Sequence, residues 1–236
     1  MNKLRLFLQY LPYIFQSAWF NFHYLPFSQA IKLPILLYKP KLQKCRGWIK
    51  IESDNDSTGM IQLGKPLVSI YPNNGVKIVM GGGIIFKGKC AIGNNSVINI
   101  SATGSVVFGQ GFIATSSLKL VCYKKISFGE QVLIGWENLF CDTDFHAIKN
   151  IPSLEKQQAF TPINIGSHNW FAMKCNTLKG TKTPEHCIVG ANSFLFKDYT
   201  SIGKFCLIAG QPAKLIKENV YRDANDDLIN YGDSVI

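Results

Sequence analysis

The sequence predicts an all-β solenoid in which short strands wind into a triangular coil. Three observations support this fold class: a six-residue pattern recurs from Ile165 onward, the same pattern occurs earlier in the chain, and small residues fall at one fixed place in each unit. A short fixed period is typical of repeat architectures, because each unit packs only against its neighbours in adjacent coils.

Each unit opens with an aliphatic residue, an aromatic residue or Thr, often continues with Gly, and usually has a small residue in fifth place. We expect the first residue to fill the core and the fifth to point into a crowded corner. The second residue lies at a turn, where Gly tolerates the backbone. Three units close one coil, and successive coils pair as parallel strands. The clearest units are residues 165–170, 171–176, 177–182, 183–188 and 189–194, preceded by 86–91, 92–97, 98–103, 128–133 and 134–139.

The pattern divides the chain into three parts and one loop. Residues 1–47 form a basic aromatic segment, residues 48–217 form the solenoid, and residues 218–236 form an acidic tail. Within the solenoid, residues 147–161 lack the six-residue pattern, so we expect a loop that leaves the coil there.

The first part is rich in aromatic side chains, and all of its charged residues are basic. Residues 1–50 contain eight Lys and Arg and no acidic residue. A helix from about Leu4 to Trp19 places apolar residues on one face. The segment caps the open end of the solenoid, lies on an anionic membrane surface, or does both. Nucleic acid is not an expected partner, since no groove-reading motif accompanies the charge.

The cysteines favour a reducing compartment, and we expect a cytoplasmic protein, peripheral on the inner membrane if the first segment binds lipid. Seven Cys occur without a CxxC pair, and four of them fall on the small inward place of a unit: Cys90, Cys175, Cys187 and Cys206. They therefore read as core residues and not as disulfide partners.

The strongest catalytic candidate lies where the pattern gives way to the loop. In the run Cys141-Asp-Thr-Asp-Phe-His, the residues Asp142, Asp144 and His146 are spaced by two, so on an extended backbone they share a face. A carboxylate beside an imidazole fixes its tautomer and raises its basicity, as a general base requires. Of the two carboxylates, Asp144 is favoured because it is nearer in sequence.

His168 and His186 suggest a competing interpretation, in which the protein holds a metal ion. They lie 18 residues apart, one full coil, and both occupy the fourth place of their units. We expect their side chains to stack as outward neighbours. With His146 they would supply three histidines, as a γ-class carbonic anhydrase needs, but His146 falls on a different phase of the repeat. We expect no metal.

With these units and motifs, the sequence resembles the hexapeptide-repeat acyltransferases, clearly over residues 86–217. The motifs include Val189-Gly-Ala-Asn-Ser-Phe-Leu-Phe-Lys-Asp and Ala209-Gly-Gln-Pro-Ala-Lys. The resemblance implies a left-handed parallel β-helix, a homotrimer with sites between neighbouring subunits, and acetyl-CoA as cosubstrate. It also implies that His146 is the catalytic base.

The resemblance further implies a set of residues that contact coenzyme A. The pantetheine arm is expected along a flat wall, and the lysines are expected near the phosphates. These residues are Trp170, Ala172, Met173, Gly190, Ala191, Lys197, Lys214 and Lys217.

We therefore expect an acetyl-CoA-dependent O-acetyltransferase acting on a hydroxyl of a carbohydrate, in surface polysaccharide biosynthesis. One rival is an N-acetyltransferase on an amino sugar or an antibiotic. A rival of another class is a β-helix scaffold or binding protein without turnover.

Overall fold

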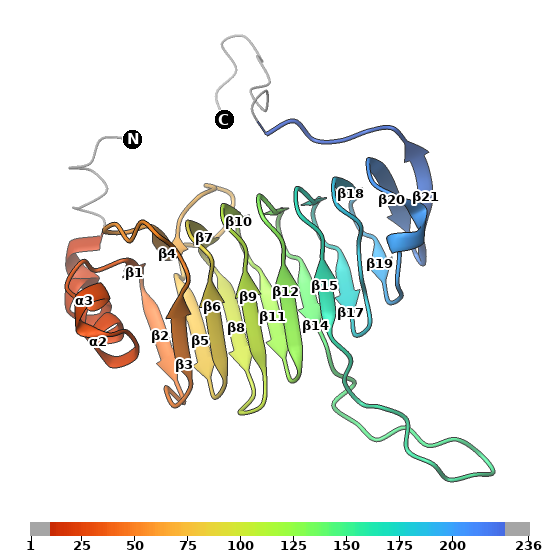
Figure 1. Ribbon diagram of the computed structural model, residues 1–236, viewed down its shortest axis with the longest axis horizontal. Coiled ribbons are helices and arrows are strands. Elements are labelled where there is room, and N and C mark those ends of the chain that lie inside the picture. Colours follow the sequence, from red (N-terminus) through yellow and green to blue (C-terminus); the bar gives the residue numbers. More distant parts are fainter. Residues whose placement is uncertain (1–9, 225–236) are drawn as a thin grey trace.

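The chain winds into a parallel β-helix whose coils stack along one axis (Figure 1). The computed structural model describes residues 10–224. Three sheets of nine, seven and five strands form the three faces of the coil. The predicted fold class is confirmed.

We call the three sheets A, B and C. Sheet A contains, in spatial order, β1 (Ile35–Leu37), β4 (Ile61–Lys65), β7 (Cys90–Gly93), β10 (Phe112–Ala114), β13 (Leu133–Ile134), β16 (Trp170–Phe171), β18 (Cys187–Val189), β20 (Cys206–Gly210) and β21 (Ala213–Glu218). Sheet B contains β19 (Phe194–Leu195), β17 (Asn176–Leu178), β14 (Leu139–Cys141), β11 (Lys119–Cys122), β8 (Ser96–Ile100), β5 (Val76–Met80) and β2 (Pro40–Gln43). Sheet C contains β15 (Ile163–Ile165), β12 (Lys125–Phe128), β9 (Ser105–Phe108), β6 (Gly83–Phe86) and β3 (Trp48–Ile51).

The chain visits the sheets in the order A, B, C, so each coil has an A–B, a B–C and a C–A corner. Opening and fifth residues of the units point inward as predicted: Phe171 and Cys175 are buried, and so are Val189 and Ser193. Aromatic side chains one coil apart stack inside. The ring centroids of Phe86 and Phe108 are 5.5 Å apart, and those of Phe108 and Phe128 are 5.6 Å apart.

The solenoid begins earlier than the sequence suggested. Strand β1 pairs with β4, and β2 pairs with β5, so residues from Ile35 onward already belong to the first coil and not to a separate segment ending at residue 47. The six-residue pattern does not reveal this coil, because long turns interrupt the count at residues 52–60, between the first and second coils, and at residues 66–75, within the second coil. At the other end, β21 pairs antiparallel with β20 and closes sheet A.

A helical cap covers the open end of the first coil (Figure 1). It consists of η1 (Leu11–Tyr13), α2 (Ile14–Tyr24) and α3 (Phe27–Ala30). The side chains of Ser17 and Asn21 face the edge strand β1. Asn21 donates to the carbonyl of Ile35 (2.7 Å) and accepts from its N–H (3.1 Å), and Ser17 accepts from the N–H of Leu37 (2.9 Å). The helix thus satisfies backbone groups that an exposed edge strand would leave open.

This contact corrects the predicted helix. The part before residue 10 lies outside the described residues. Within them the helix ends at Tyr24 and buries Ser17, Phe20 and Asn21. Phe15 and Trp19, which the predicted helix places on its apolar face, are exposed. The buried face thus combines the core residue Phe20 with two polar residues that bind the edge strand.

The predicted excursion loop leaves the coil at the B–C corner, between β14 and β15, and extends far from the solenoid (Figure 1). All seven cysteines are free. None of the helices between residues 10 and 224 is long and apolar enough to cross a membrane.

We expect Asn21→Ala to lower the free energy of unfolding by about 2 kcal/mol, because it leaves the buried N–H and carbonyl of Ile35 without partners. Urea denaturation measures the change. Gln16→Ala, on the exposed side of the same helix, is the control and should change stability by less than about 0.5 kcal/mol. Equal effects of the two substitutions would contradict the edge-capping role.

Candidate active site

An apolar groove of about 370 Å³ runs along the A–B corner of the middle coils. Its floor comes from successive turns after the strands of sheet A, and its walls come from large apolar side chains. Eight residues line it: Thr115, Leu133, Gly135, Trp136, Trp170, Ala172, Met173 and Ala191.

The groove exists because small residues follow one another along this corner. The Gly135 N–H donates to Phe171 O (2.8 Å), that of Ala172 to Val189 O (2.9 Å), and that of Gly190 to Ile208 O (2.9 Å), so these three residues lie one above another. A Cβ on Gly135 would lie 2.9 Å from the backbone of Ala172. Only residues with little or no side chain fit there.

Four residues predicted from sequence line this groove: Trp170, Ala172, Met173 and Ala191. Gly190 lies in the same row of turns. Sequence reasoning missed Leu133 and Trp136, one coil earlier. The six-residue pattern marks the unit 134–139, but only the pairing of Leu133 with Trp170 shows that it lies one coil before the predicted residues.

The predicted lysines separate into two groups. Lys214 and Lys217 are exposed on β21, and they pair with Ala209 and Leu207. They therefore lie on sheet A, the sheet that borders the groove, at its far edge. Lys197 does not join them. It follows β19 at the B–C corner, with its ammonium nitrogen 5.5 Å from the ring centroid of Tyr199.

His146 is exposed at the start of the excursion loop. Its side chain makes no hydrogen bond or ion pair with any residue between 10 and 224. It lies at the B–C corner, like Lys197, and not at the corner that carries the groove.

Asp142 is fully buried, and its carboxylate has a structural role. Its oxygens accept hydrogen bonds from the backbone N–H groups of Tyr123 (2.6 Å), Lys124 (2.7 Å) and Lys125 (2.8 Å). These residues form the B–C turn of the preceding coil. The carboxylate thus fixes that turn from the coil above.

Asp144 has a different partner from the expected imidazole. It forms an ion pair with Lys179, whose ammonium also donates to the carbonyl of Gln158 (2.7 Å). The N–H of Asp144 donates to the carbonyl of Ala159 (2.8 Å). Lys179, which sequence reasoning missed, therefore joins the two ends of the excursion loop.

The expected common face of Asp142, Asp144 and His146 is not present. Phe145, which lies between Asp144 and His146, has a φ of +61° that interrupts the extended backbone assumed by the spacing argument. Asp142 points into the coil, Asp144 points at Lys179, and His146 remains exposed.

His168 and His186 stack as predicted, with ring centroids 4.5 Å apart and an interplanar angle of 5°. The ring of Phe205 continues the stack at the C–A corner, with its centroid 4.6 Å from that of His186. Burial lowers the pKa of His186, and the neighbouring His168 lowers it further. His146 is at another corner. Within the described chain, no three His, Cys, Asp or Glu side chains lie close enough together to hold a metal ion.

We expect Asp142→Asn to lower the free energy of unfolding by about 2–3 kcal/mol. The amide loses the charge that strengthens three hydrogen bonds, and its NH₂ group cannot accept them. Asp144→Asn, the control, removes only a partly exposed ion pair and should cost less than about 1 kcal/mol. Thermal and urea denaturation measure both. A stable Asp142→Asn protein would contradict the structural role of this carboxylate.

Several solved structures are similar to this chain at low identity. They include the polySia-specific acetyltransferase NeuO (20% identity, TM-score 0.47, covering 83% of this chain and 81% of that one) and the polysialic acid O-acetyltransferase OatWY (20%, 0.42, 78% and 88%). A galactoside acetyltransferase in complex with coenzyme A matches at 15% identity and a TM-score of 0.38, covering 97% and 88%. No protein-family model matches the sequence, and no curated protein matches it. Its own six-residue units, wound on three parallel sheets, give this chain the hexapeptide-repeat fold.

Proposed function

We propose that this protein is an acetyltransferase that moves an acetyl group from acetyl-CoA to a hydroxyl of a carbohydrate. The observation that carries the proposal is the apolar groove, because four residues chosen from sequence as pantetheine contacts line one continuous surface. A groove of this kind suits a long, narrow arm with few charges.

In this arrangement the nucleotide lies toward β21, where Lys214 and Lys217 supply positive charge for its phosphates. The pantetheine arm runs along the groove past Ala191, Ala172 and Trp170. Its thioester end then lies near Trp136 and Thr115, at the other end of the groove.

His146 acts as the general base. An imidazole nitrogen takes the proton of the acceptor hydroxyl as its oxygen attacks the thioester carbonyl. The new C–O bond forms, the C–S bond breaks, and the proton passes to the leaving thiolate. This route needs no covalent intermediate on the enzyme and no metal. It does not use Asp142, whose oxygens are occupied by backbone N–H groups.

The base and the groove belong to different corners of one chain, so we infer that the site forms between chains in a homotrimer. The B–C corner of one prism, with His146 and Lys197, faces the A–B corner of the next, with the groove. Three identical contacts of this head-to-tail kind close a ring. The excursion loop, which extends away from its own coil, lies against the neighbour.

We expect His146→Ala to lower acetyl transfer by roughly 10²- to 10⁴-fold, the usual contribution of a general base. Release of free thiol from acetyl-CoA with a panel of sugars and nucleotide sugars measures the rate. Coenzyme A affinity, measured by calorimetry, should stay within about twofold of wild type, and light scattering should give three times 26.4 kDa. Near-normal turnover would exclude His146 as the base.

Mixed assemblies separate the two halves of the site. Ala172→Trp should block the groove and abolish coenzyme A binding. When differently tagged His146→Ala and Ala172→Trp chains are co-expressed, mixed trimers should regain activity, because some interfaces combine an intact base with an intact groove. Inactive mixed trimers would show that each site belongs to one chain.

We further infer that the helical cap contacts an anionic membrane surface, on the cytoplasmic side, where the seven free cysteines stay reduced. Its outer side exposes a set of apolar side chains. Phe15 is 84% exposed and Phe27 is 70% exposed; Leu11, Trp19, Phe22 and Ile31 are exposed as well.

Charge complementarity favours anionic lipid as the occupant of this surface. Lys32 follows α3, and Lys41 lies on the edge strand β2 beside the cap. Lys44 is next to Cys45, whose carbonyl is 3.1 Å from the His23 imidazole at the end of α2. Three basic residues thus lie beside the cap, and residues 1–50 contain no carboxylate. One carboxylate from outside that segment, Asp56, contacts the cap and accepts a hydrogen bond from Gln29 of α3 (2.9 Å). Such a surface suits the headgroup region of an anionic leaflet.

We expect the protein to sediment with phosphatidylglycerol-containing vesicles at low salt and to be released in large part by high salt. Screening weakens an attraction of about 1 kcal/mol per basic residue. Replacing Lys32, Lys41 and Lys44 with Gln should reduce sedimentation strongly, while replacing Lys119 and Lys125 on sheets B and C should not. Wild-type protein that stays in the supernatant would leave the segment as a cap only.

A further inference from the structure

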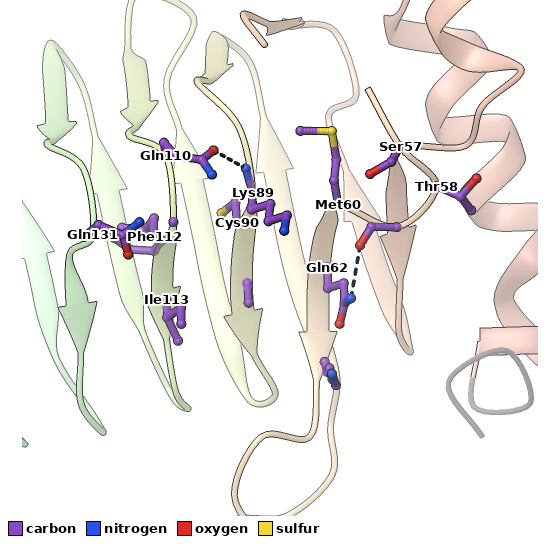
Figure 2. Close-up of a pocket in the computed structure, with 14 residues that line it drawn as sticks. Ser57, Thr58, Met60, Gln62, Lys89, Cys90, Gln110, Phe112, Ile113 and Gln131 are labelled. Carbon is purple, nitrogen blue, oxygen red and sulfur yellow. Dashed lines mark hydrogen bonds between the residues drawn. The ribbon is translucent and has the colours of Figure 1, made fainter. Parts of the chain in front are cut away.

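A second hollow, of about 630 Å³, lies on the outer face of sheet A next to the groove (Figure 2). It spans β4, β7 and β10, and residues 57–60 border it on the side of the cap. Its size lies within the roughly 300–1,000 Å³ range of small-molecule sites. Ala91 and Ile113 lie on the sheet beneath it.

The polar groups around this hollow are cationic or neutral. Two lysines, Lys65 and Lys89, line it, and no carboxylate does. Neither lysine forms an ion pair with a residue in the described part of the chain. Lys65 is partly buried, and this burial lowers the pKa of its ammonium group. An anion bound beside Lys65 would compensate that cost.

Three glutamines add neutral donors and acceptors: Gln62, Gln110 and Gln131 (Figure 2). The Gln110 side-chain oxygen accepts from the N–H of Lys89 (2.7 Å), which leaves its NH₂ group for a ligand. Gly88 makes this possible, because a Cβ at that position would lie 1.5 Å from the Gln110 oxygen. Gln62 donates to Gly59 O (3.1 Å). Such amides can exchange hydrogen bonds with the hydroxyls of a sugar, while the apolar floor can pack against the apolar face of its ring.

The hollow and the groove adjoin on sheet A. Ile113 lines the hollow and pairs with Leu133, which lines the groove. Along the A–B corner, Lys65 pairs with Gly93, and Gly93 lies directly beneath Thr115 of the groove. Because Gly93 has no side chain, nothing from that position stands between Lys65 and the end of the groove.

We propose that this hollow binds carboxylated sugars of the acceptor glycan, with Lys65 at the end of β4 and Lys89 before β7 each holding a carboxylate and the glutamines holding hydroxyls. The inference rests on the proposed function, because it takes the thioester end of acetyl-CoA to lie near Thr115. It adds the class of substrate: an acidic glycan and not a neutral one.

The test compares carboxylated oligosaccharides with their own methyl esters, which differ only in charge. Oligosaccharides of galacturonic, glucuronic and sialic acid are titrated into the wild-type protein by calorimetry without acetyl-CoA. At least one acid should bind, and its ester should bind at least tenfold more weakly. Added salt should weaken the binding of the acid. Lys65→Met with Lys89→Met should lower the affinity for the acid at least tenfold, while Lys119→Met, on sheet B, should not.

The proposal fails if none of the acids binds, if acid and ester bind equally, or if the double variant binds the acid like wild type. Coenzyme A affinity is measured on the same proteins, and it should be unchanged in the double variant. Wild-type protein that binds the acid but not coenzyme A would overturn the proposed acetyl transfer and leave the acidic-sugar site in place. Protein that binds coenzyme A but no acid would overturn only the proposal of an acidic-sugar site in the hollow.

Discussion

Backbone pairing between successive coils is the constraint on which the rest of this structure depends. Each strand must accept one neighbour on either side at about 4.8 Å, so every residue lies directly above the equivalent residue of the coil below. Inward rows must therefore match in size, as in the Phe86, Phe108 and Phe128 stack. Outward rows become surfaces with one chemical character. The groove is such a row of small residues, and the His168 and His186 stack is another.

This periodic constraint explains what the sequence could predict. The six-residue units gave the solenoid, the inward cysteines and the stacked histidines, because each depends only on position within a unit. The resemblance to the hexapeptide-repeat acyltransferases, and not the units alone, located four of the eight groove residues. The other four, Thr115, Leu133, Gly135 and Trp136, lie before the excursion loop. The loop interrupts the count from one coil to the next, so their place beneath Trp170 could not be read from spacing.

The misses share a cause: hydrogen bonds to the backbone of another segment. Asn21 and Ser17 are polar residues that a hydrophobic-face argument assigns to solvent, yet both serve the edge of β1. Asp142 appeared to be a catalytic carboxylate, yet it holds the turn of the preceding coil. Lys179 is distant in sequence from the loop whose two ends it joins. Side chains of this kind have no period, and only the three-dimensional arrangement identifies their partners.

The order of the coils also acts as a molecular ruler. In sheet A, strands β4 and β7 separate β1, next to the cap, from β10, and Thr115 directly after β10 already lines the groove. Three steps of about 4.8 Å hold that end of the groove roughly 14 Å from the first coil. If the cap lies on a membrane, a sugar attached directly at the headgroups remains below the groove, whereas a glycan of several units reaches it. The number of coils would then select acceptors by their length.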